Sequence, residues 1–243
     1  MVLWRSDDGS SLRRANRVDW RAGLVGLLLL FPACSHVERP EQVPVNPLRK
    51  TALIIVDVQN DFCPGGSLAV EQGDQTVPII NRLQGEFDLV VATQDWHPQN
   101  HSSFKSNSPD GIWPDHCVQG TAGAELVSAL DTTRIARVFR KGTDIEIDSY
   151  SGFFDNDHRH STGLGEFLRE QEITDVFVVG LATDYCVKFT ALDAAGEGFT
   201  TTLIVDATRG VEVEPGDVER AIQEMRDAGV KVVESESLLD GDR

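Results

Sequence analysis

The sequence predicts an α/β protein with three α/β/α layers and a mostly parallel central sheet. Short apolar runs rich in β-branched residues alternate along the chain with segments of helical spacing. Several runs are apolar at consecutive positions, which is typical of strands buried on both faces of a parallel sheet. Polar residues follow these runs directly. Because the carboxyl ends of parallel strands meet at one rim, we expect the chemistry to lie there.

The apolar runs and the helical segments alternate in chain order. The runs expected to be strands are 52–56, 89–92, 134–140, 176–179, 201–210 and 230–235. The segments expected to be helices are 76–83, 163–170, the stretch after Asp184, and 217–228, with Asp217 as the expected N-cap. The order of strands and helices predicts parallel crossover connections.

The length of 243 residues suits one large domain, which we expect over residues 50–236, with a C-terminal tail at 237–243. A proline-containing linker is expected at 35–49. Residues 1–34 carry five arginines and an apolar run at 22–31 that ends near Ala33 and Cys34. This pattern is typical of a signal peptide or lipoprotein segment. A misplaced start codon and a disordered tail are the alternatives.

The composition restricts the partners. A formal net charge of −17 disfavours a nucleic acid or an anionic membrane surface as a partner, because both carry negative charge. The four cysteines, Cys34, Cys63, Cys117 and Cys186, are widely spaced and form no CxxC pair. They therefore predict no disulfide framework and no redox compartment.

Cys186 stands between an apolar strand and a helix. The strand at 176–179 stops at Gly180, and the helical pattern begins after Asp184. Free backbone N–H groups and the positive end of the helix dipole favour a thiolate at such a position and can hold an oxyanion. A small buried core cysteine is the alternative. Asp57 and Lys141 follow other strands, so we expect them at the same rim.

A second group of polar residues follows the strand at 89–92. Asp95 and His97 are two residues apart, so their side chains are expected to point the same way. His101 and His116 add imidazoles from the following loop. Carboxylate and imidazole groups are ligands for a divalent metal. The alternative is that Asp95 only forms a turn and that His97 and His101 are solvated loop residues.

Six segments in chain order resemble bacterial nicotinamidases of the isochorismatase-like hydrolase superfamily. They are VDVQNDF, GGSLAV, TQDWHPQNHSSF, WPDHCVQGT, FRKGTD and GLATDYCVKFTALDA. The resemblance covers about residues 50–236, and several long motifs in order are more specific than one short pattern. One departure is Tyr185, which precedes Cys186 where some relatives have histidine.

The resemblance implies a set of site residues. A catalytic triad would consist of Asp57, Lys141 and Cys186, and the backbone N–H groups of Ala182 and Cys186 would form the oxyanion hole after a cis peptide between Leu181 and Ala182. A divalent metal, zinc, iron or manganese, would be held by Asp95, His97 and His116, with His101 as a further candidate. Phe62, Trp113 and Tyr150 would line the substrate pocket, with ordinary core packing as the alternative.

The function implied by the resemblance is metal-dependent hydrolysis of nicotinamide to nicotinate and ammonia through a thioester, within pyridine nucleotide (NAD) salvage. Pyrazinamide is a second expected substrate. The expected location is cytoplasmic, with an exported or lipid-anchored form through Cys34 as the alternative, and a homo-oligomer is a candidate assembly. Another cysteine amidase of the superfamily, acting on carbamoyl or ureido amides, is the nearest alternative function. The other alternative is a non-catalytic envelope lipoprotein whose domain binds a pyridine or a metal without turnover.

Overall fold

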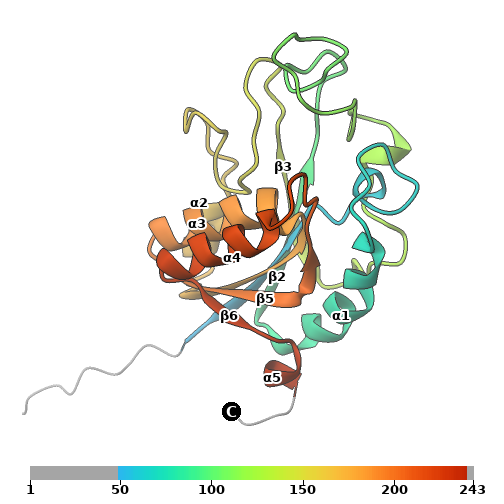
Figure 1. Ribbon diagram of the computed structural model, residues 1–243. Coiled ribbons are helices and arrows are strands. Elements are labelled where there is room, and N and C mark those ends of the chain that lie inside the picture. The colour runs from blue at the N-terminus through green and yellow to red at the C-terminus, as the bar shows by residue number, and fades with distance from the viewer. Residues whose placement is uncertain (1–48, 240–243) are drawn as a thin grey trace, which may run out of the picture. The chain divides into compact units, whose positions relative to one another are not determined.

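The described part of the chain, residues 49–239 of a computed structural model, contains one sheet of six strands (Figure 1). The strands are β1 (Thr51–Val56), β2 (Leu89–Asp95), β3 (Ile135–Lys141), β4 (Asp175–Leu181), β5 (Thr200–Arg209) and β6 (Lys231–Val233). Their order across the sheet is β3-β2-β1-β4-β5-β6, and every pairing between them is parallel. The predicted α/β fold with a parallel sheet is confirmed.

Five helices cover the sheet: α1 (Thr76–Leu83), α2 (Leu164–Glu170), α3 (Lys188–Gly196), α4 (Asp217–Asp227) and α5 (Glu236–Leu239). In β1, Ala52, Ile54 and Val56 pack in one core cluster with residues of α2, α3 and α4. Leu53 and Ile55 pack in a second cluster with residues of α1. This alternation follows from the two-residue period of a strand and gives three layers (Figure 1).

The central strand β1 is buried from end to end on both faces, apart from its first residue. Ala52 to Val56 are all 0% exposed. Burying a Leu, Ile or Val side chain contributes roughly 1.5–3 kcal/mol each, so β1 and its neighbours hold the rim in place.

Several predicted element boundaries differ from the structure by one to three residues. The strand predicted at 89–92 continues to Asp95, because Thr93, Gln94 and Asp95 pair with β3 despite their polar side chains. The prediction that Asp217 is an N-cap is wrong. Gly216, with a φ of 89°, occupies that position, and Asp217 is the first residue of α4, where its Oδ2 accepts the N–H of Glu214 at 2.7 Å.

The connection from β4 to α3 differs from a simple strand-to-helix turn. The Leu181–Ala182 peptide is cis, and a π-helical turn at Thr183–Val187, labelled η5, precedes α3. Cys186 therefore lies in η5 and not in the first turn of an α-helix. Gly180 has a φ of 110°, and a Cβ there would lie 2.1 Å from the carbonyl oxygen of Val56. Only glycine fits so close to β1.

The terminal segments predicted from the sequence lie largely outside the described residues. The segment at 1–34 lies wholly outside, as do most of the linker at 35–49 and the end of the tail at 237–243. Within residues 49–239, none of the helices has the length and apolar character needed to cross a membrane.

Candidate active site

Three reactive side chains meet at the carboxyl rim of the sheet. Asp57 follows β1, Lys141 ends β3, and Cys186 lies in η5 after β4. Lys141 Nζ lies 2.9 Å from Asp57 Oδ2 and donates to Cys186 Sγ at 3.3 Å. The exposed fractions are 0% for Asp57, 2% for Lys141 and 6% for Cys186. The predicted triad residues are thus in mutual contact and shielded from bulk water.

Neighbouring groups fix the orientation of Asp57 and Lys141. The hydroxyl of Thr93 donates to Asp57 Oδ1 at 2.6 Å, which leaves Oδ2 facing Lys141. Oδ2 forms the ion pair with Lys141 but accepts no hydrogen bond of good geometry, so it has lone pairs free for a further proton. Lys141 also donates to the carbonyl oxygen of Ser149 at 2.8 Å and to Asp95 Oδ1.

Asp57, Asp95 and Cys186 surround the ammonium of Lys141. One ligand atom from each of the three lies within 4.8 Å of the others. Lys141 Nζ contacts all three residues. Since a cation already occupies this centre, the group is not free to hold a metal ion.

The pKa values in this cluster reflect burial and mutual charge. Burial raises the pKa of Asp57, and the positive charge of Lys141 only partly opposes it. Burial by itself lowers the pKa of Lys141, but the carboxylates of Asp57 and Asp95 outweigh it and raise the pKa well above its usual value. Burial also raises the pKa of the Cys186 thiol well above its usual value, against the nearby Lys141. Burial therefore opposes the predicted preference for a thiolate and favours the neutral thiol.

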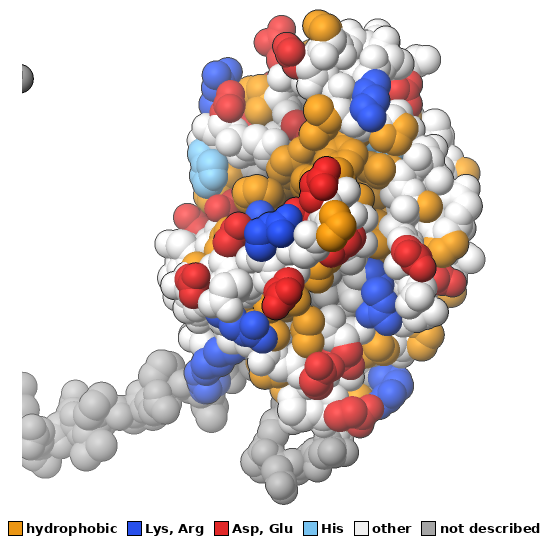
Figure 2. All heavy atoms as spheres, in the orientation of Figure 1, with side chains coloured by type: hydrophobic (Ala, Val, Ile, Leu, Met, Phe, Trp, Pro, Cys, Tyr) orange, Lys and Arg blue, Asp and Glu red, His pale blue; other side chains and the backbone are white. Residues whose placement is uncertain are grey.

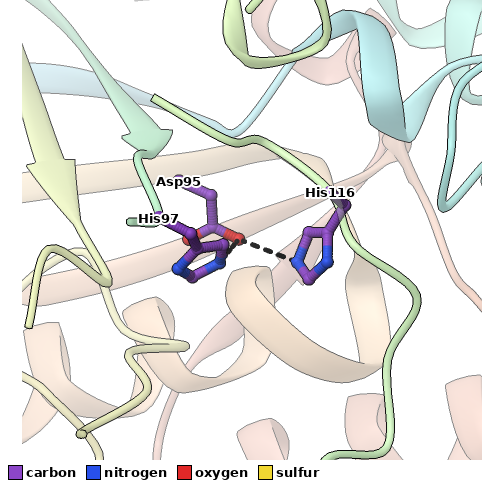
Figure 3. A group of neighbouring side chains, drawn as sticks. All are labelled: Asp95, His97 and His116. Atoms are coloured by element: carbon purple, nitrogen blue, oxygen red, sulfur yellow. Dashed lines mark ion pairs between the residues drawn. The ribbon is translucent and has the colours of Figure 1, made fainter. Parts of the chain in front are cut away.

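A carboxylate and two imidazoles form a second group beside this cluster. Asp95 Oδ2 lies 3.5 Å from His97 Nε2 and 3.9 Å from His116 Nε2. Figure 3 shows the three side chains pointing toward one another, Asp95 from the end of β2, His97 from the loop that follows, and His116 from a separate loop. Their ligand atoms all lie within 4.8 Å of one another, and all three residues are buried.

The hydrogen bonds of the two histidines leave Nε2 free for a metal. His97 Nδ1 lies 2.9 Å from the carbonyl oxygen of Gly142, and His116 Nδ1 lies 2.8 Å from that of Pro114. Because a carbonyl can only accept, each Nδ1 carries the hydrogen and each Nε2 presents its lone pair to Asp95. Two imidazole nitrogens and one carboxylate oxygen suit a divalent ion such as zinc, iron or manganese. The residues therefore fit the implied metal.

The pKa values of the two histidines shift in opposite directions. Burial by itself lowers the pKa of His97, but the Asp95 carboxylate outweighs it and raises the pKa. Burial lowers the pKa of His116, and Asp95 opposes this only in part. Protons therefore compete with a metal chiefly at His97.

His101 lies next to these ligands but in a different arrangement. Its ring stacks on His97 with centroids 4.2 Å apart. Its Nδ1 accepts the N–H of Ser103 at 3.3 Å, which places the hydrogen on Nε2, 3.4 Å from the carbonyl oxygen of Ile147. His101 groups with His97 and Asp148, and not with Asp95 and His116. In this tautomer His101 does not present a lone pair to the group around Asp95.

A small cavity of about 30 Å³ joins the thiol and the candidate metal ligands. The three aromatic residues predicted as walls, Phe62, Trp113 and Tyr150, all line it, as do Asp95, His116, Ala182 and Cys186. Trp113 Nε1 donates to the hydroxyl of Tyr150 at 3.2 Å. Although Phe62 and Trp113 are buried, they face this cavity as well as the core.

Four further lining residues were not predicted as walls: Leu68, Asp148, Tyr185 and Val211. The ring of Tyr185 meets Trp113 edge to face, with centroids 5.0 Å apart. The position of Tyr185 directly before Cys186 is a signal that could have identified it. Val211 comes from the loop between β5 and α4, and no local pattern in the sequence links that loop to the site.

Apolar side chains also surround this region on the surface. Figure 2 shows hydrophobic side chains gathered between the loops at the top of the view and the helices below them. Ile112 is 55% exposed and precedes Trp113, and Phe189 is 36% exposed and stacks on Tyr150 with centroids 5.4 Å apart. The approach to the cavity is therefore largely apolar.

Comparison with known proteins identifies relatives over most of the chain. Residues 51–237 match the model of the isochorismatase domain. The nicotinamidase of Escherichia coli (strain K12) is 49% identical over 195 residues, which cover 73% of this chain and 92% of that protein.

Two solved structures share the fold at high identity. The L. infantum protein in complex with nicotinate is 44% identical, with a TM-score of 0.73, covering 77% of this chain and 93% of that one. The pyrazinamidase of Pyrococcus horikoshii in complex with zinc is 42% identical, with a TM-score of 0.68, covering 76% of this chain and 99% of that one.

Proposed function

The chain belongs to the isochorismatase family, and from this premise we propose that it is a metal-dependent amidase that hydrolyses nicotinamide to nicotinate and ammonia. The observation that carries the proposal is the contact of Cys186 Sγ with Lys141 Nζ at 3.3 Å, beside the carboxylate of Asp57 and the group of Asp95, His97 and His116. Relatives named as nicotinamidases support the substrate, and pyrazinamide is the expected second substrate.

The first half of the reaction forms a thioester. Asp57 Oδ2, whose lone pairs are free, accepts the proton of the Cys186 thiol as the sulfur attacks the carboxamide carbon. Burial raises the pKa of both Asp57 and Cys186. The proton therefore moves between two groups whose pKa values are both raised, and the negative charge stays beside Lys141 throughout. Lys141 stabilises the negative charge as it shifts between the carboxylate and the sulfur.

The second half expels ammonia and restores the thiol. Asp57 hands its proton to the departing nitrogen as the C–N bond breaks, and then takes a proton from water as that water attacks the thioester. Nicotinate leaves and the thiol regains its proton. We assign the oxyanion hole to the backbone N–H groups of Ala182 and Cys186, which both lie in the turn that lines the cavity.

The metal ligands would be Asp95, His97 and His116. A divalent ion held there would supply a Lewis-acidic anchor for the ring nitrogen of the substrate. Asp95 links the two halves of the site, because its Oδ1 pairs with Lys141 while its Oδ2 faces both histidines. His97 and His116 each keep Nε2 directed into the site through their bonds to backbone carbonyls. We keep zinc, iron and manganese as the candidate ions.

Substrate entry requires the cavity walls to part. A cavity of about 30 Å³ has room for little more than one water molecule, whereas benzene occupies an apolar cavity of roughly 150 Å³. The rings of Trp113 and Tyr150 both contact the ring of Tyr185 in η5. We infer that Trp113, Tyr150 and Tyr185 move outward when the pyridine ring enters.

The cellular setting belongs to the proposal as well. We assign the chain to cytoplasmic salvage of pyridine nucleotides. Lipid attachment at Cys34 and assembly into a homo-oligomer stay predictions from the sequence, and both can be tested on the full chain by palmitate labelling and by sedimentation.

The direct test is to incubate the purified chain with nicotinamide and to measure nicotinate and ammonia together. We expect equal amounts of the two products, loss of activity after chelation, and recovery when zinc, iron or manganese is returned. Pyrazinamide and an N-carbamoyl amide serve as comparison substrates. Hydrolysis of the N-carbamoyl amide without hydrolysis of nicotinamide would favour the carbamoyl or ureido amidase instead.

A further inference from the structure

The backbone of Asp95 lies beyond the ladder that joins β1 to β2. The last registered pair of that ladder is Ile55 with Ala92, and β1 ends at Val56 while β2 continues to Asp95. On its other side Asp95 pairs with Lys141 of β3. The N–H and C=O groups of Asp95 that face away from β3 therefore need another partner, because buried backbone groups are costly to leave unpaired.

The side chain of Gln59 supplies that partner. Its Oε1 accepts the N–H of Asp95 at 2.8 Å, and its Nε2 donates to the C=O of Asp95 at 2.9 Å. Both main-chain groups of one residue are thus bound by one amide, as a neighbouring strand would bind them. Nε2 also donates to the carbonyl oxygen of Ala124 at 2.7 Å. Gln59 is 0% exposed, so these bonds form without competition from bulk water.

Gln59 is itself tied to the segment that carries Asp57. Its backbone N–H donates to the C=O of Asp57 at 2.8 Å, and its own C=O accepts the N–H of Phe62 at 3.1 Å. The amide of Gln59 therefore connects the segment with the proton carrier to the segment with Asp95. Moving this amide would shift Asp95 relative to Asp57, His97 and His116.

We propose that Gln59 is a positioning residue of the metal site, which holds the Asp95 carboxylate against the two histidines without touching the ion. This inference rests on the metal-binding part of the proposed function. Residues that orient metal ligands change metal affinity by about 10- to 100-fold when they are replaced. A glutamine that serves only to fill the core would change stability and leave metal affinity unaltered.

Gln94 is the matched control for this distinction. It is also a buried glutamine, and its Nε2 donates to the same carbonyl oxygen of Ala124, at 3.0 Å. Its side chain makes no bond to Asp95 in the described part of the chain. Replacing Gln94 therefore removes a comparable buried hydrogen bond but leaves both bonds between Gln59 and Asp95 in place.

The experiment measures binding of Zn²⁺ to the full chain by calorimetry after chelation, with circular dichroism as the check that each metal-free variant is folded. Gln59→Met keeps the volume and removes all three hydrogen bonds. Gln59→Glu keeps the acceptor for the Asp95 N–H and, as a buried neutral carboxylic acid, has one proton to donate to one of the two carbonyl oxygens of Asp95 and Ala124. We expect zinc affinity to fall about 10- to 100-fold in Gln59→Met, to fall less in Gln59→Glu, and to stay within about 2-fold of wild type in Gln94→Ala.

The outcomes separate this inference from the proposed function. Wild-type affinity in folded Gln59→Met, or an equal loss in Gln94→Ala, would overturn the positioning role even if the wild-type chain hydrolyses nicotinamide. A graded loss in the two Gln59 variants supports the role even if nicotinamide is not the substrate. If Gln59→Met does not fold, the zinc affinities of Gln59→Glu and Gln94→Ala are compared instead. A loss in Gln59→Glu alone supports the positioning role, and wild-type affinity in Gln59→Glu or an equal loss in both overturns it.

Discussion

Lys141 is the residue whose charge holds the candidate site together. It is 2% exposed and lies between the carboxylates of Asp57 and Asp95. Two buried carboxylates without a cation would repel each other and lack solvation. The ammonium therefore stabilises the fold as well as the proposed chemistry.

We predict that Lys141→Met lowers the free energy of unfolding by about 3–5 kcal/mol at neutral pH, because it leaves buried charges unpaired. Chemical denaturation measures this loss. Lys188→Met is the control, since Lys188 pairs with Glu224 at the surface and its loss should cost about 1 kcal/mol or less. A similar small loss in Lys141→Met would show that Lys141 does not stabilise the two carboxylates.

The free energy of unfolding of the same variant should depend on pH through Asp57. Burial already raises the pKa of Asp57, and removing Lys141 removes the main opposing charge. The folded variant then binds protons more tightly than its unfolded chain, so its free energy of unfolding should increase as pH falls through the raised pKa. Denaturation midpoints at neutral and mildly acidic pH measure the difference.

The sequence could indicate the candidate site residues but not their supporting contacts. Asp57, Asp95, Lys141 and Cys186 each follow or end an apolar run, so a parallel sheet must bring them to one rim. The bond from Thr93 to Asp57, and the contact of the Ser149 carbonyl with Lys141, depend on distant segments meeting in the fold. Backbone carbonyls carry no signal in the sequence at all.

At the scale of elements, a buried carboxylate ties the loop between β5 and α4 to the turn that carries Cys186. Asp184 in η5 accepts the N–H of Val211 at 2.9 Å and that of Glu212 at 2.8 Å, one with each carboxylate oxygen. Asp184 is 5% exposed, and Val211 lines the cavity. The side chain of Asp184 therefore binds the loop that carries Val211 to η5.

We predict that Asp184→Ala speeds hydrogen exchange at the amides of Val211 and Glu212 by about 10-fold or more, because each loses its acceptor. We also expect a higher KM for nicotinamide, since the wall at Val211 becomes mobile. The control is Asp206→Ala, which removes the bonds of Asp206 to Ser235, next to α5. Unchanged exchange at Val211 and Glu212 in Asp184→Ala would show that other contacts hold the loop.

Helices and strands could be predicted where apolar residues repeat with a clear period. The residues at which they begin and end were harder to predict. Helix α1 has the predicted limits of 76–83 because its apolar residues repeat at helical spacing. The end of β2 was missed because hydrogen bonds to β3 extend the strand through polar residues, which propensity does not anticipate. The turn η5 was missed because a π-helical turn has no distinctive residue pattern.

At the scale of the whole molecule, every residue assigned to the proposed reaction lies between Asp57 and Cys186. We predict that residues 46–243, produced without the first 45 residues, hydrolyse nicotinamide with a kcat/KM within about 3-fold of the full chain. The sheet, all three core clusters of the described residues and the site belong to this part. Side-by-side ammonia assays and thermal melts measure the comparison. A large loss of activity with an unchanged melting temperature would assign the missing segment a part in the site.

The order of the strands explains why one rim holds both halves of the site. Strands β3, β2, β1 and β4 lie side by side and deliver Lys141, Asp95, Asp57 and the turn with Cys186 in that spatial order. In chain order, however, these residues are spread over 130 positions, from 57 to 186. The proposed chemistry therefore depends on the whole sheet.

The most direct measurement is the rate of nicotinamide hydrolysis by Cys186→Ala beside that by Cys63→Ala, a second buried free cysteine that neither reacts nor binds metal in the proposed mechanism. Removing the nucleophile should lower kcat by at least about 10⁴-fold, with zinc binding retained, while Cys63→Ala stays within about 3-fold of wild type. Hydrolysis by Cys186→Ala at the rate of the wild-type chain would contradict the mechanism.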